Sequence, residues 1–420
     1  MRLALLCSEP VRPAMAGIGI RYLELARRLH RPAVQTVLVS PGEPAEAPPL
    51  PGEVRRFVRG GLARLLADCG AAVAQGQLAN DLLLECPSLP VAIDLYDPWL
   101  VENFQYLGSL GLAPFRNDHA SWVLQMGRGD FFLCSSPEQR LFYLGFLTAL
   151  GRVNPERVAA DADCRQLVAT VPFGLPAPGE LPPHRPLLPD RTAGERRLLF
   201  GGLYDWYDPL TLLAALERLQ ETPWTLTFVA NPNPESTPQA LLAEVERQCR
   251  RRGWWQQRVR VHPWVQAERR WDLLRDADLL VAPHHPTLET RLSLRTRFLE
   301  ALAVGCPVVV TDGGTVGRLL REAEAGWVVP PHDDAALASA VAAALGDGEE
   351  VARRRQRGLE VASRFAWERV LAPLLAWAAD PRPDPFKDRF AFTPVATVPP
   401  DRLLRRVARR LGRLLPGGAA

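Results

Sequence analysis

The sequence predicts an α/β protein of two doubly wound domains that face each other across a cleft. Short apolar runs alternate with amphipathic, helix-period segments along nearly the whole chain of 420 residues. The apolar runs are almost uninterrupted, which is typical of parallel strands covered by helices on both faces. The alternation stops once, at a proline-rich stretch, and then starts again. Two similar units joined by a linker follow from this pattern.

Each unit contains six expected strands. They are residues 3–7, 34–39, 82–85, 91–95, 131–134 and 167–171 in the first unit, and 198–200, 226–229, 259–261, 279–282, 308–311 and 327–329 in the second. We expect an N-terminal domain over 1–178, a linker over 179–195, a C-terminal domain over 196–380 that includes a last apolar helix, and a proline-rich stretch with a basic tail over 381–420. Ligands of such sheets bind at the carboxyl ends of the strands, so the cleft is the expected site.

Composition excludes several classes of protein. Hydrophobic residues make up 47% and charged residues 23%, the balance of an ordinary globular protein rather than a collagen, coiled coil or disordered chain. No window approaches 18 uninterrupted apolar residues, and the first apolar run is too short for a signal peptide. The seven cysteines are scattered without a CxxC pair, which indicates free thiols and neither a zinc site nor a disulfide framework. We expect a cytoplasmic protein.

Charge is distributed unevenly between the body and the tail. The net charge is +3, but residues 381–420 hold eight arginines and Lys387 against three aspartates, a net +6, so the remainder carries −3. A weakly acidic body argues against nucleic acid as a partner. Residues 401–415 place leucines and a valine on one helical face and arginines on the other, which predicts an interfacial helix at an anionic membrane surface, the inner face of the plasma membrane. The alternatives are a helix docked on its own protein and a disordered basic tail.

The most specific motifs lie in the second half. Residues 295–314, RTRFLEALAVGCPVVVTDGG, follow an expected strand and are followed by AGWVVPPHDDAAL at 325–337. This order resembles the C-terminal half of the GT-B glycosyltransferases of family 4, over roughly residues 196–365. In the first half, a glycine loop at 15–21 and the Val-Pro-Phe-Gly segment at 171–174 agree with it. The segments 94–98 and 130–140 resemble a subgroup associated with bacterial surface polysaccharides.

The resemblance implies both fold and activity. It implies the GT-B fold and transfer of a sugar from a nucleotide-sugar donor to a glycan or polyprenyl-linked acceptor, in cell-surface polysaccharide synthesis. Retention of anomeric configuration, no cofactor and no metal are also implied. Two alternatives keep the fold: a non-catalytic scaffold of a polysaccharide-assembly complex, and a sugar-nucleotide epimerase. A nicotinamide enzyme would need a third glycine in the first loop, where the sequence has Tyr22.

The expected donor site draws on both halves. Arg295 and Arg297, with Thr296 between them, stand at the start of a helix, where backbone amides and guanidinium groups suit a departing diphosphate. The alternative interpretation is that the two arginines are solvated and merely flank the helix. By resemblance, the loop with Gly17 and Gly19 also approaches the donor. Glu300 matches the second glutamate of the family's E-x7-E motif and would accept the ribose hydroxyl protons, unless it is simply a surface acid of that helix.

The sequence departs from the family pattern at two places. The first glutamate of E-x7-E falls on Leu292, and we expect Glu289 to take over its contact with the donor sugar. The family's two phosphate-binding cations align with Gly202 and Tyr207, so both are missing. Either Arg295 and Arg297 compensate for them, or donor handling differs from the family, or activity is lost.

Acceptor-side candidates are fewer. Asp97 follows an expected strand and could position or deprotonate an acceptor hydroxyl, although a turn acid before Pro98 explains it equally well. Of the adjacent His284 and His285 only one can point into a site, and we expect His285 to approach the donor sugar. No carboxylate stands at a metal-binding spacing from them, and we therefore expect no metal site.

Overall fold

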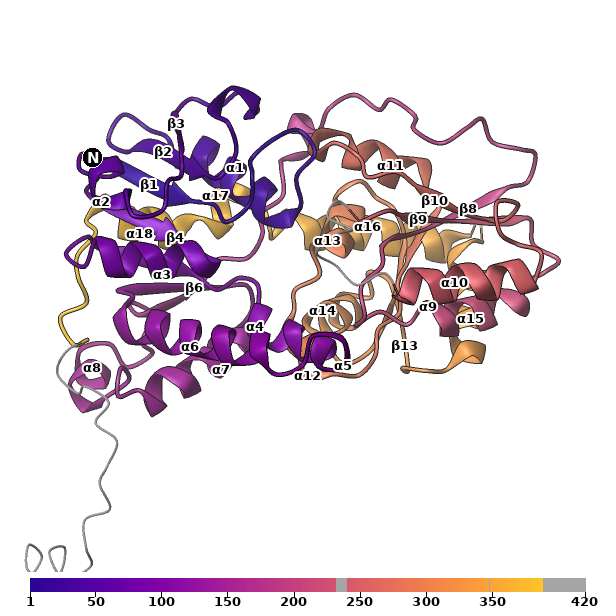
Figure 1. The fold of residues 1–420 in the computed structure, drawn as a ribbon. Helices are drawn as coiled ribbons and strands as arrows, with labels where there is room; N and C mark the ends of the chain where they lie inside the picture. Colours follow the sequence, from indigo (N-terminus) through magenta and orange to yellow (C-terminus); the bar gives the residue numbers. More distant parts are fainter. Residues whose placement is uncertain (232–239, 347, 388–420) are drawn as a thin grey trace, which may run out of the picture.

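The computed structural model describes residues 1–387 except 232–239 and 347, and within them the chain forms two parallel sheets (Figure 1). The N-terminal sheet has the order β3-β2-β1-β4-β5-β6-β7 and the C-terminal sheet the order β10-β9-β8-β11-β12-β13. The strands of the first are β1 (Arg2–Leu6), β2 (Gln35–Ser40), β3 (Glu53–Arg56), β4 (Ala71–Ala74), β5 (Val91–Asp94), β6 (Phe131–Cys134) and β7 (Val168–Thr170). Those of the second are β8 (Arg196–Gly202), β9 (Trp224–Val229), β10 (Val259–His262), β11 (Leu279–Val281), β12 (Val308–Thr311) and β13 (Trp327–Val329).

Both sheets are doubly wound, as predicted. The chain builds outward from β1 to β3 and then returns to place β4 on the other side of β1, and β8 to β13 repeat this course. The order therefore reverses between β1 and β4 and between β8 and β11. Loops at the carboxyl ends of strands diverge at such a point and leave a crevice for a ligand.

Helices cover both faces of each sheet. Those of the first half are α1 (Gly17–Leu29), α2 (Leu62–Leu65), α3 (Gly76–Glu85), α4 (Trp99–Glu102), α5 (Leu107–Leu110), α6 (Ala113–Arg128), α7 (Pro137–Ala149) and α8 (Pro155–Ala160). Those of the second half are α9 (Pro209–Glu217), α10 (Ala240–Arg251), α11 (Arg270–Asp276), α12 (Leu288–Leu292), α13 (Thr296–Ala303), α14 (Thr315–Ala323), α15 (Asp334–Ala344), α16 (Glu349–Ser363), α17 (Trp367–Val370) and α18 (Ala372–Ala379). Within the described residues, no helix is both long and apolar enough to cross a bilayer.

The last two helices return to the first domain. Trp367, Leu371 and Leu374 are buried in the core beneath β1, β4 and β6, although the sequence analysis grouped this apolar segment with the C-terminal domain. The chain crosses back at Leu175, whose N–H donates to the Phe365 carbonyl and whose carbonyl accepts from the Trp367 N–H. Gly174 has no side chain because a Cβ there would enter the Trp367 ring. In Figure 1, α17 and α18 (yellow) accordingly lie among the indigo and purple elements.

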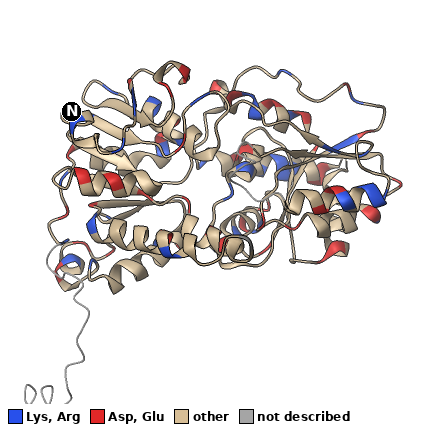
Figure 2. Cartoon of the chain, viewed as in Figure 1, with Lys and Arg blue, Asp and Glu red and all other residues tan. Residues whose placement is uncertain are grey.

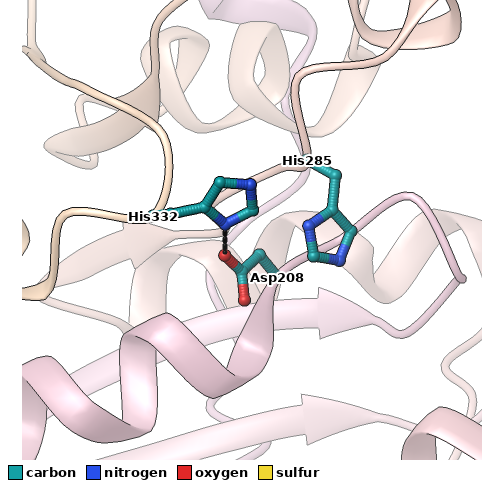
Figure 3. A group of neighbouring side chains, drawn as sticks. All are labelled: Asp208, His285 and His332. Atoms are coloured by element: carbon teal, nitrogen blue, oxygen red, sulfur yellow. Dashed lines mark hydrogen bonds and ion pairs between the residues drawn. The ribbon is translucent and has the colours of Figure 1, made fainter.

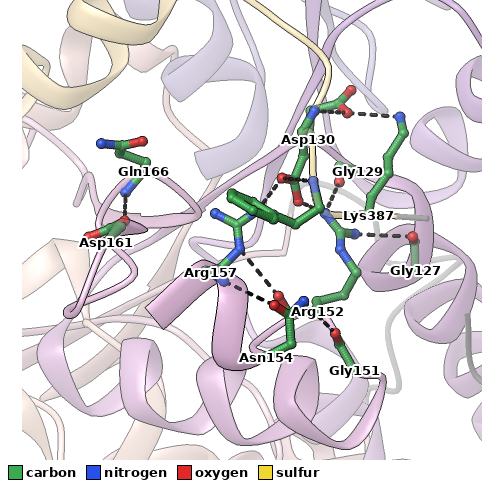
Figure 4. Close-up of polar contacts among 12 residues, drawn as sticks. Gly127, Gly129, Asp130, Gly151, Arg152, Asn154, Arg157, Asp161, Gln166 and Lys387 are labelled. Carbon is green, nitrogen blue, oxygen red and sulfur yellow. Dashed lines mark hydrogen bonds and ion pairs between the residues drawn. The ribbon is translucent and has the colours of Figure 1, made fainter. Parts of the chain in front are cut away.

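A buried ion cluster fastens the chain after α18. Asp384 accepts a hydrogen bond from Arg152 Nη2 at 2.6 Å and pairs with Arg157, and all three side chains are buried. Lys387 Nζ lies 2.8 Å from Asp130 Oδ1 (Figure 4). The cluster fixes the segment up to residue 387 beside α8, on the N-terminal domain. The predicted amphipathic segment 401–415 lies outside the described residues.

Two local predictions were wrong. Residues 82–85, expected as a strand, form the last turn of α3, and the edge strand β3 and the internal strand β4 were missed. The Leu-Leu-Leu run of α3 is too short to distinguish the hydrophobic period of a helix from that of a strand. β4 is Ala-Ala-Val-Ala; alanine is depleted in strands, but it fits here because all four residues are buried.

Charged side chains of both signs interleave over both halves of the described chain, as Figure 2 shows. Helix α10 illustrates the pattern, since Glu244 and Glu246 pair with Arg247 and Arg250 along one exposed face. Such pairs contribute little to stability but keep the surface hydrated. Charged side chains that are buried, such as Arg21, Asp94 and Glu289, are the exception to this pattern.

Candidate active site

Three adjoining cavities lie between the two domains. Two of them hold the predicted site residues. The first, the apolar cavity, has about 260 Å³ and is walled by Leu199, Val229, Trp264, Val265, Leu273, Leu274 and Leu280 with Arg270, Arg297 and Glu300. The second, the polar cavity, has about 270 Å³ and is walled by Tyr96, Asp97, Glu102, Tyr204, Trp206, Tyr207, Arg295 and Arg297. They meet at Gly17, Thr296 and Arg297, which line both.

The apolar cavity carries one ion pair on its wall. Arg270, at the start of α11, donates from Nε to Glu300 Oε1 at 2.6 Å. This pairing fixes the Glu300 carboxylate at the cavity and leaves its second oxygen free to accept other hydrogen bonds. The indole N–H of Trp264 is buried with no partner among the described residues. A flat apolar slot with a fixed carboxylate at one end fits a nucleoside.

Arg297 reaches from α13 to the loop after β8. Its Nη1 donates to the carbonyl oxygens of Phe200 at 2.9 Å and Gly202 at 3.0 Å, and its guanidinium lies 4.6 Å from the Tyr207 ring centroid. A Cβ at Gly201 would stand 2.7 Å from that Nη1, and Gly201 has φ +90°. The loop can therefore hold only glycine there. A guanidinium from α13 thus occupies the space beside the residues that replace the family's loop cations.

Arg295 and Glu289 form a buried ion pair behind the polar cavity. Glu289 is fully buried, and its Oε2 accepts a hydrogen bond from Arg295 Nη2. Burial alone would lower the pKa of Arg295, but the Glu289 carboxylate together with Tyr207 and Glu102 outweighs it, and the pKa is raised. The guanidinium lies between the Trp206 and Tyr207 rings, 5.5 Å and 5.3 Å from their centroids. Arg295 is thereby held as a permanent cation on the cavity wall.

Asp97 and Glu102 form a second acidic group in the polar cavity. Their carboxyl groups are hydrogen-bonded to each other. Burial is the largest cause that raises the pKa of both, and the Asp97 charge drives the pKa of Glu102 well above its ordinary value. Two adjacent carboxyls of this kind share one proton. The hydrogen bond between them favours the proton on Glu102, with Asp97 as its acceptor, and Asp97 lines the cavity.

The N-terminus of α1 is capped by an acid from the preceding loop. Glu9 accepts hydrogen bonds from the backbone N–H groups of Gly19 and Ala16. Burial raises the pKa of Glu9, and those two hydrogen bonds partly offset the rise. A Cβ at Gly19 would collide with Met15, so the loop requires glycine there for packing. Gly17 remains on the wall of both cavities.

One contact closes the cleft from the opposite side. Glu138, at the start of α7 in the first domain, accepts hydrogen bonds from Thr315 Oγ1 at 3.1 Å and Arg318 Nε at 3.0 Å. Both donors belong to the first turns of α14 in the second domain, where an acid is favoured by the helix dipole. The two domains therefore touch across the site.

Comparison with known proteins agrees with this geometry. Residues 195–347 match the sequence model of a family described as glycosyl transferases group 1. That span includes β8, α13 and the Gly-Gly turn before α14, so it covers the second domain's side of the cleft. Over this span, the chain belongs to the group 1 glycosyltransferases of family 4. Its arrangement of two parallel sheets is the GT-B fold.

Curated relatives match this glycosyltransferase over part of their length. A D-inositol 3-phosphate glycosyltransferase of Xylanimonas cellulosilytica is 31% identical over 183 residues, 44% of this chain and 40% of the relative. A phosphatidyl-myo-inositol mannosyltransferase of Mycobacterium leprae is 34% identical over 102 residues, 24% of this chain and 26% of the relative. The matched region thus spans two fifths or less of these curated proteins.

Solved structures match the glycosyltransferase over nearly its whole length. A sucrose-phosphate synthase from Thermosynechococcus elongatus has a TM-score of 0.65 at 16% identity, covering 89% of this chain and 97% of that one. Anabaena Alr3699/HepE in complex with UDP-glucose has a TM-score of 0.62 at 16% identity, covering 90% and 98%. At these identities the likeness shows the fold alone.

The cleft of the glycosyltransferase brings together most of the predicted site residues. Those that line its cavities are Gly17, Asp97, Arg295, Thr296, Arg297 and Glu300. Glu289 lies one layer behind, against Arg295, and Gly19 presents its amide to Glu9 instead of the cavity. His285 lines neither cavity and lies beside Asp208 and His332. Its neighbour His284 packs inward on Tyr207, and burial lowers the pKa of His284 so that it stays neutral.

Sequence reasoning missed four contributors to this site. Glu102 lies five residues after Asp97, and a pair of acids across a helix start was the available signal. Arg270 is separated from Glu300 by 30 residues, so only the fold reveals their pairing. The Tyr204 and Trp206 rings stack 4.8 Å apart and wall the polar cavity. Their spacing in the sequence resembles that of ordinary core aromatics.

Proposed function

We propose that this chain transfers a glycosyl group from a nucleoside diphosphate sugar to a hydroxyl group of a glycan or lipid-linked acceptor, with retention of anomeric configuration and no metal at the reacting centre. The observation that carries the proposal is the polar cavity. Two arginines and an acid pair converge there beside a nucleoside-sized slot, with walls from both domains. Residues 1–178 supply the acceptor side and residues from 196 onward the donor side.

The donor would bind across both cavities. The base packs against Trp264 and Val265, and the ribose hydroxyls donate to Glu300, whose orientation Arg270 fixes. The diphosphate then lies where the cavities meet, at Thr296 and Arg297. As the bond from the anomeric carbon to the diphosphate breaks, negative charge grows on the leaving oxygen. Arg297, Arg295 and the first-turn amides of α13 stabilise that charge.

The acceptor would be activated by Asp97. Its ionised carboxylate accepts the proton of the acceptor hydroxyl while that oxygen bonds to the anomeric carbon on the same face that the diphosphate leaves, which retains the configuration. Glu102 keeps its own proton and orients Asp97 through their shared hydrogen bond. Glu289 acts as a positioning residue, because it touches Arg295 and not the cavity. We do not assign it a contact with the donor sugar.

An apolar groove beside Glu102 supports a lipid-linked acceptor. It has about 300 Å³, and the exposed side chains of Phe104, Leu107, Leu110, Leu112 and Phe115 gather around it. Tyr106 lines the groove and lies 6.5 Å from Trp206, ring to ring, so the groove continues toward the polar cavity. An acyl or prenyl chain fits such a surface. Polysaccharide synthesis at the inner face of the membrane is the process that such an acceptor favours.

Nucleotide binding tests the proposal directly. The full chain is screened by thermal shift against UDP, GDP, ADP, CMP and dTDP at millimolar concentration, and the best ligand is then titrated calorimetrically. We expect one of them to stabilise the protein, and Glu300→Gln to weaken its binding about tenfold. Glu322→Gln, an exposed acid of α14, serves as the matched control. If no nucleotide shifts the melting temperature, the scaffold alternative replaces the enzyme.

A further inference from the structure

Three loops of the second domain bring two histidines and an acid together. Asp208 follows β8 and begins α9, His285 follows β11, and His332 follows β13. One potential ligand atom from each lies within 4.8 Å of the others (Figure 3). Two of the loops are joined by their backbones, since Asp208 N–H donates to Pro283 at 2.8 Å and His285 N–H donates to Trp206 at 3.1 Å. The cluster therefore has a rigid base.

The chemistry of the three side chains fits a metal ion. Asp208 is buried, and its carboxylate accepts from Thr211 N–H, from the Thr211 hydroxyl and from His332 Nδ1 at 2.9 Å. The His285 ring lies 5.3 Å from the His332 ring, and neither of its nitrogens has a hydrogen-bond partner among residues 1–231, 240–346 and 348–387. Two imidazoles and one carboxylate are the donor set of many zinc sites.

The geometry needs one modest adjustment. Metal–ligand bonds of about 2.0–2.1 Å in a tetrahedral site hold ligand atoms about 3.3 Å apart. In the structure the three ligand atoms lie within 4.8 Å of one another, so they must come closer together to bind a metal ion. His332 is the side chain able to move, because it is half exposed on an outer loop. Its backbone has φ +60°, a conformation unusual for histidine, and this turns the ring over Asp208. The proton that His332 now donates to Asp208 occupies the place that a metal ion would take.

We propose that Asp208, His285 and His332 bind one divalent transition-metal ion of the Zn²⁺ type, with water completing the coordination. None of the three lines the polar or the apolar cavity, so the ion takes no part in the glycosyl transfer proposed above. Its effect is to tie together the loops after β8, β11 and β13. Trp206 and Tyr207, which wall the polar cavity, precede Asp208 in the first of these loops and are stiffened with it.

The test uses the full chain, purified without a polyhistidine tag and stripped of metal. Co²⁺ is titrated in while its visible absorption bands are followed, and Zn²⁺ is then added as a competitor. We expect one equivalent of Co²⁺ to bind with nitrogen- and oxygen-ligand bands and to be displaced by Zn²⁺. We also expect Zn²⁺ to raise the melting temperature, because it binds the folded protein.

Variants locate the ion. His285→Ala, His332→Gly and Asp208→Asn should each weaken Co²⁺ binding at least about tenfold. Glycine at 332 accepts the left-handed backbone, and asparagine at 208 can still cap α9, so these variants keep the fold. His119→Ala, an exposed histidine of α6, is the matched control and should bind normally.

Three results would overturn the proposal. They are the absence of stoichiometric binding by the unmodified chain, unchanged binding in the His285 and His332 variants, and thiolate charge-transfer bands that place the ion on a cysteine.

Discussion

Arg297 is the residue that supplies positive charge where the loop after β8 has glycine and tyrosine. The sequence identified it as a candidate because it stands at the start of a helix. It could not show that the side chain crosses to Phe200 and Gly202, nearly 100 positions earlier in the chain. Gly201, the neighbour of one of the two positions where a family cation is missing, makes room for this guanidinium. Two of its donors are used on carbonyl groups, which orients the rest toward the cavity.

Loss of Arg297 should therefore weaken binding of the diphosphate and spare that of the nucleoside. For Arg297→Ala we expect a loss of about 1.5–3 kcal/mol in nucleoside diphosphate binding, the contribution of a charge-assisted hydrogen bond. Calorimetric titration with the diphosphate and with the matching nucleoside measures both. Arg291→Ala, which replaces an exposed arginine of α12, is the control. An equal loss for both ligands would remove Arg297 from the phosphate site.

The acid pair gives a second prediction at the scale of single residues. Burial raises the pKa of both Asp97 and Glu102, and the Asp97 charge raises that of Glu102 further, so the folded state holds protons that the unfolded chain releases. Stability then falls as pH rises from about 4, the ordinary carboxyl value, through the raised pKa of Glu102. Glu102→Gln keeps a donor to Asp97 but carries no titrating proton.

We expect Glu102→Gln to melt at a higher temperature than the parent at pH 8, with the difference shrinking toward pH 4. Melting curves across this range measure it, with Glu46→Gln, an exposed acid, as the control. A difference that does not change with pH would contradict the shared proton. In transfer assays Glu102→Gln should keep most activity, whereas Asp97→Asn should lose about a hundredfold or more, the contribution of a general base.

At the scale of elements, strands were predictable where they are rich in β-branched or large apolar residues. β9, β12 and β6 were found almost to the residue because Val, Leu and Phe fill them. β4 was missed because three of its four residues are alanine, which is depleted in strands, and only the burial of all four indicates a strand. The destination of α17 and α18 was also beyond local pattern. An apolar helix face can pack on either of the two sheets. The backbone contact near Leu175 and Trp367 places these helices against the N-terminal sheet.

The segment after α18 depends on one buried carboxylate. Asp384→Ala would leave Arg152 and Arg157 buried without their shared acid, and breaking such a pair is worth about 3–5 kcal/mol. We expect urea denaturation to show a loss of that size. Asp380 lies four residues before Asp384 and forms an exposed ion pair with Arg382. Asp380→Ala removes that pair and should leave the free energy of unfolding almost unchanged. If both variants behave alike, the cluster does not fasten the segment.

At the scale of the whole molecule, the course of the chain decides where the tail begins. The chain starts in the first domain, builds the second, and returns through α17 and α18 to end its described part beside α8. The basic region over 388–420 therefore departs from the domain that also carries the exposed apolar groove at 103–115. The groove that we propose for the acceptor lies on the domain that also holds residue 387, the last residue described before the tail, whereas the loops that we propose for the donor belong mainly to the other domain. Under the proposed function, this division would let the first domain hold a lipid-linked acceptor while the donor exchanges on the other side of the cleft.

The membrane prediction follows from this arrangement. The segment 401–415 is expected to add about 1 kcal/mol of attraction to anionic vesicles per basic residue, beyond the burial of its leucines. Co-sedimentation with anionic and with neutral liposomes at low salt compares the full chain with a chain ending at Lys387, which keeps Asp384 and its cluster intact. A full chain with its six arginines at 402, 405, 406, 409, 410 and 413 changed to glutamine is the matched control. We expect the full chain alone to bind anionic vesicles strongly. If the shortened chain binds equally well, the groove at 103–115 and not the tail makes the contact, and if neither binds, the protein meets its acceptor away from the bilayer.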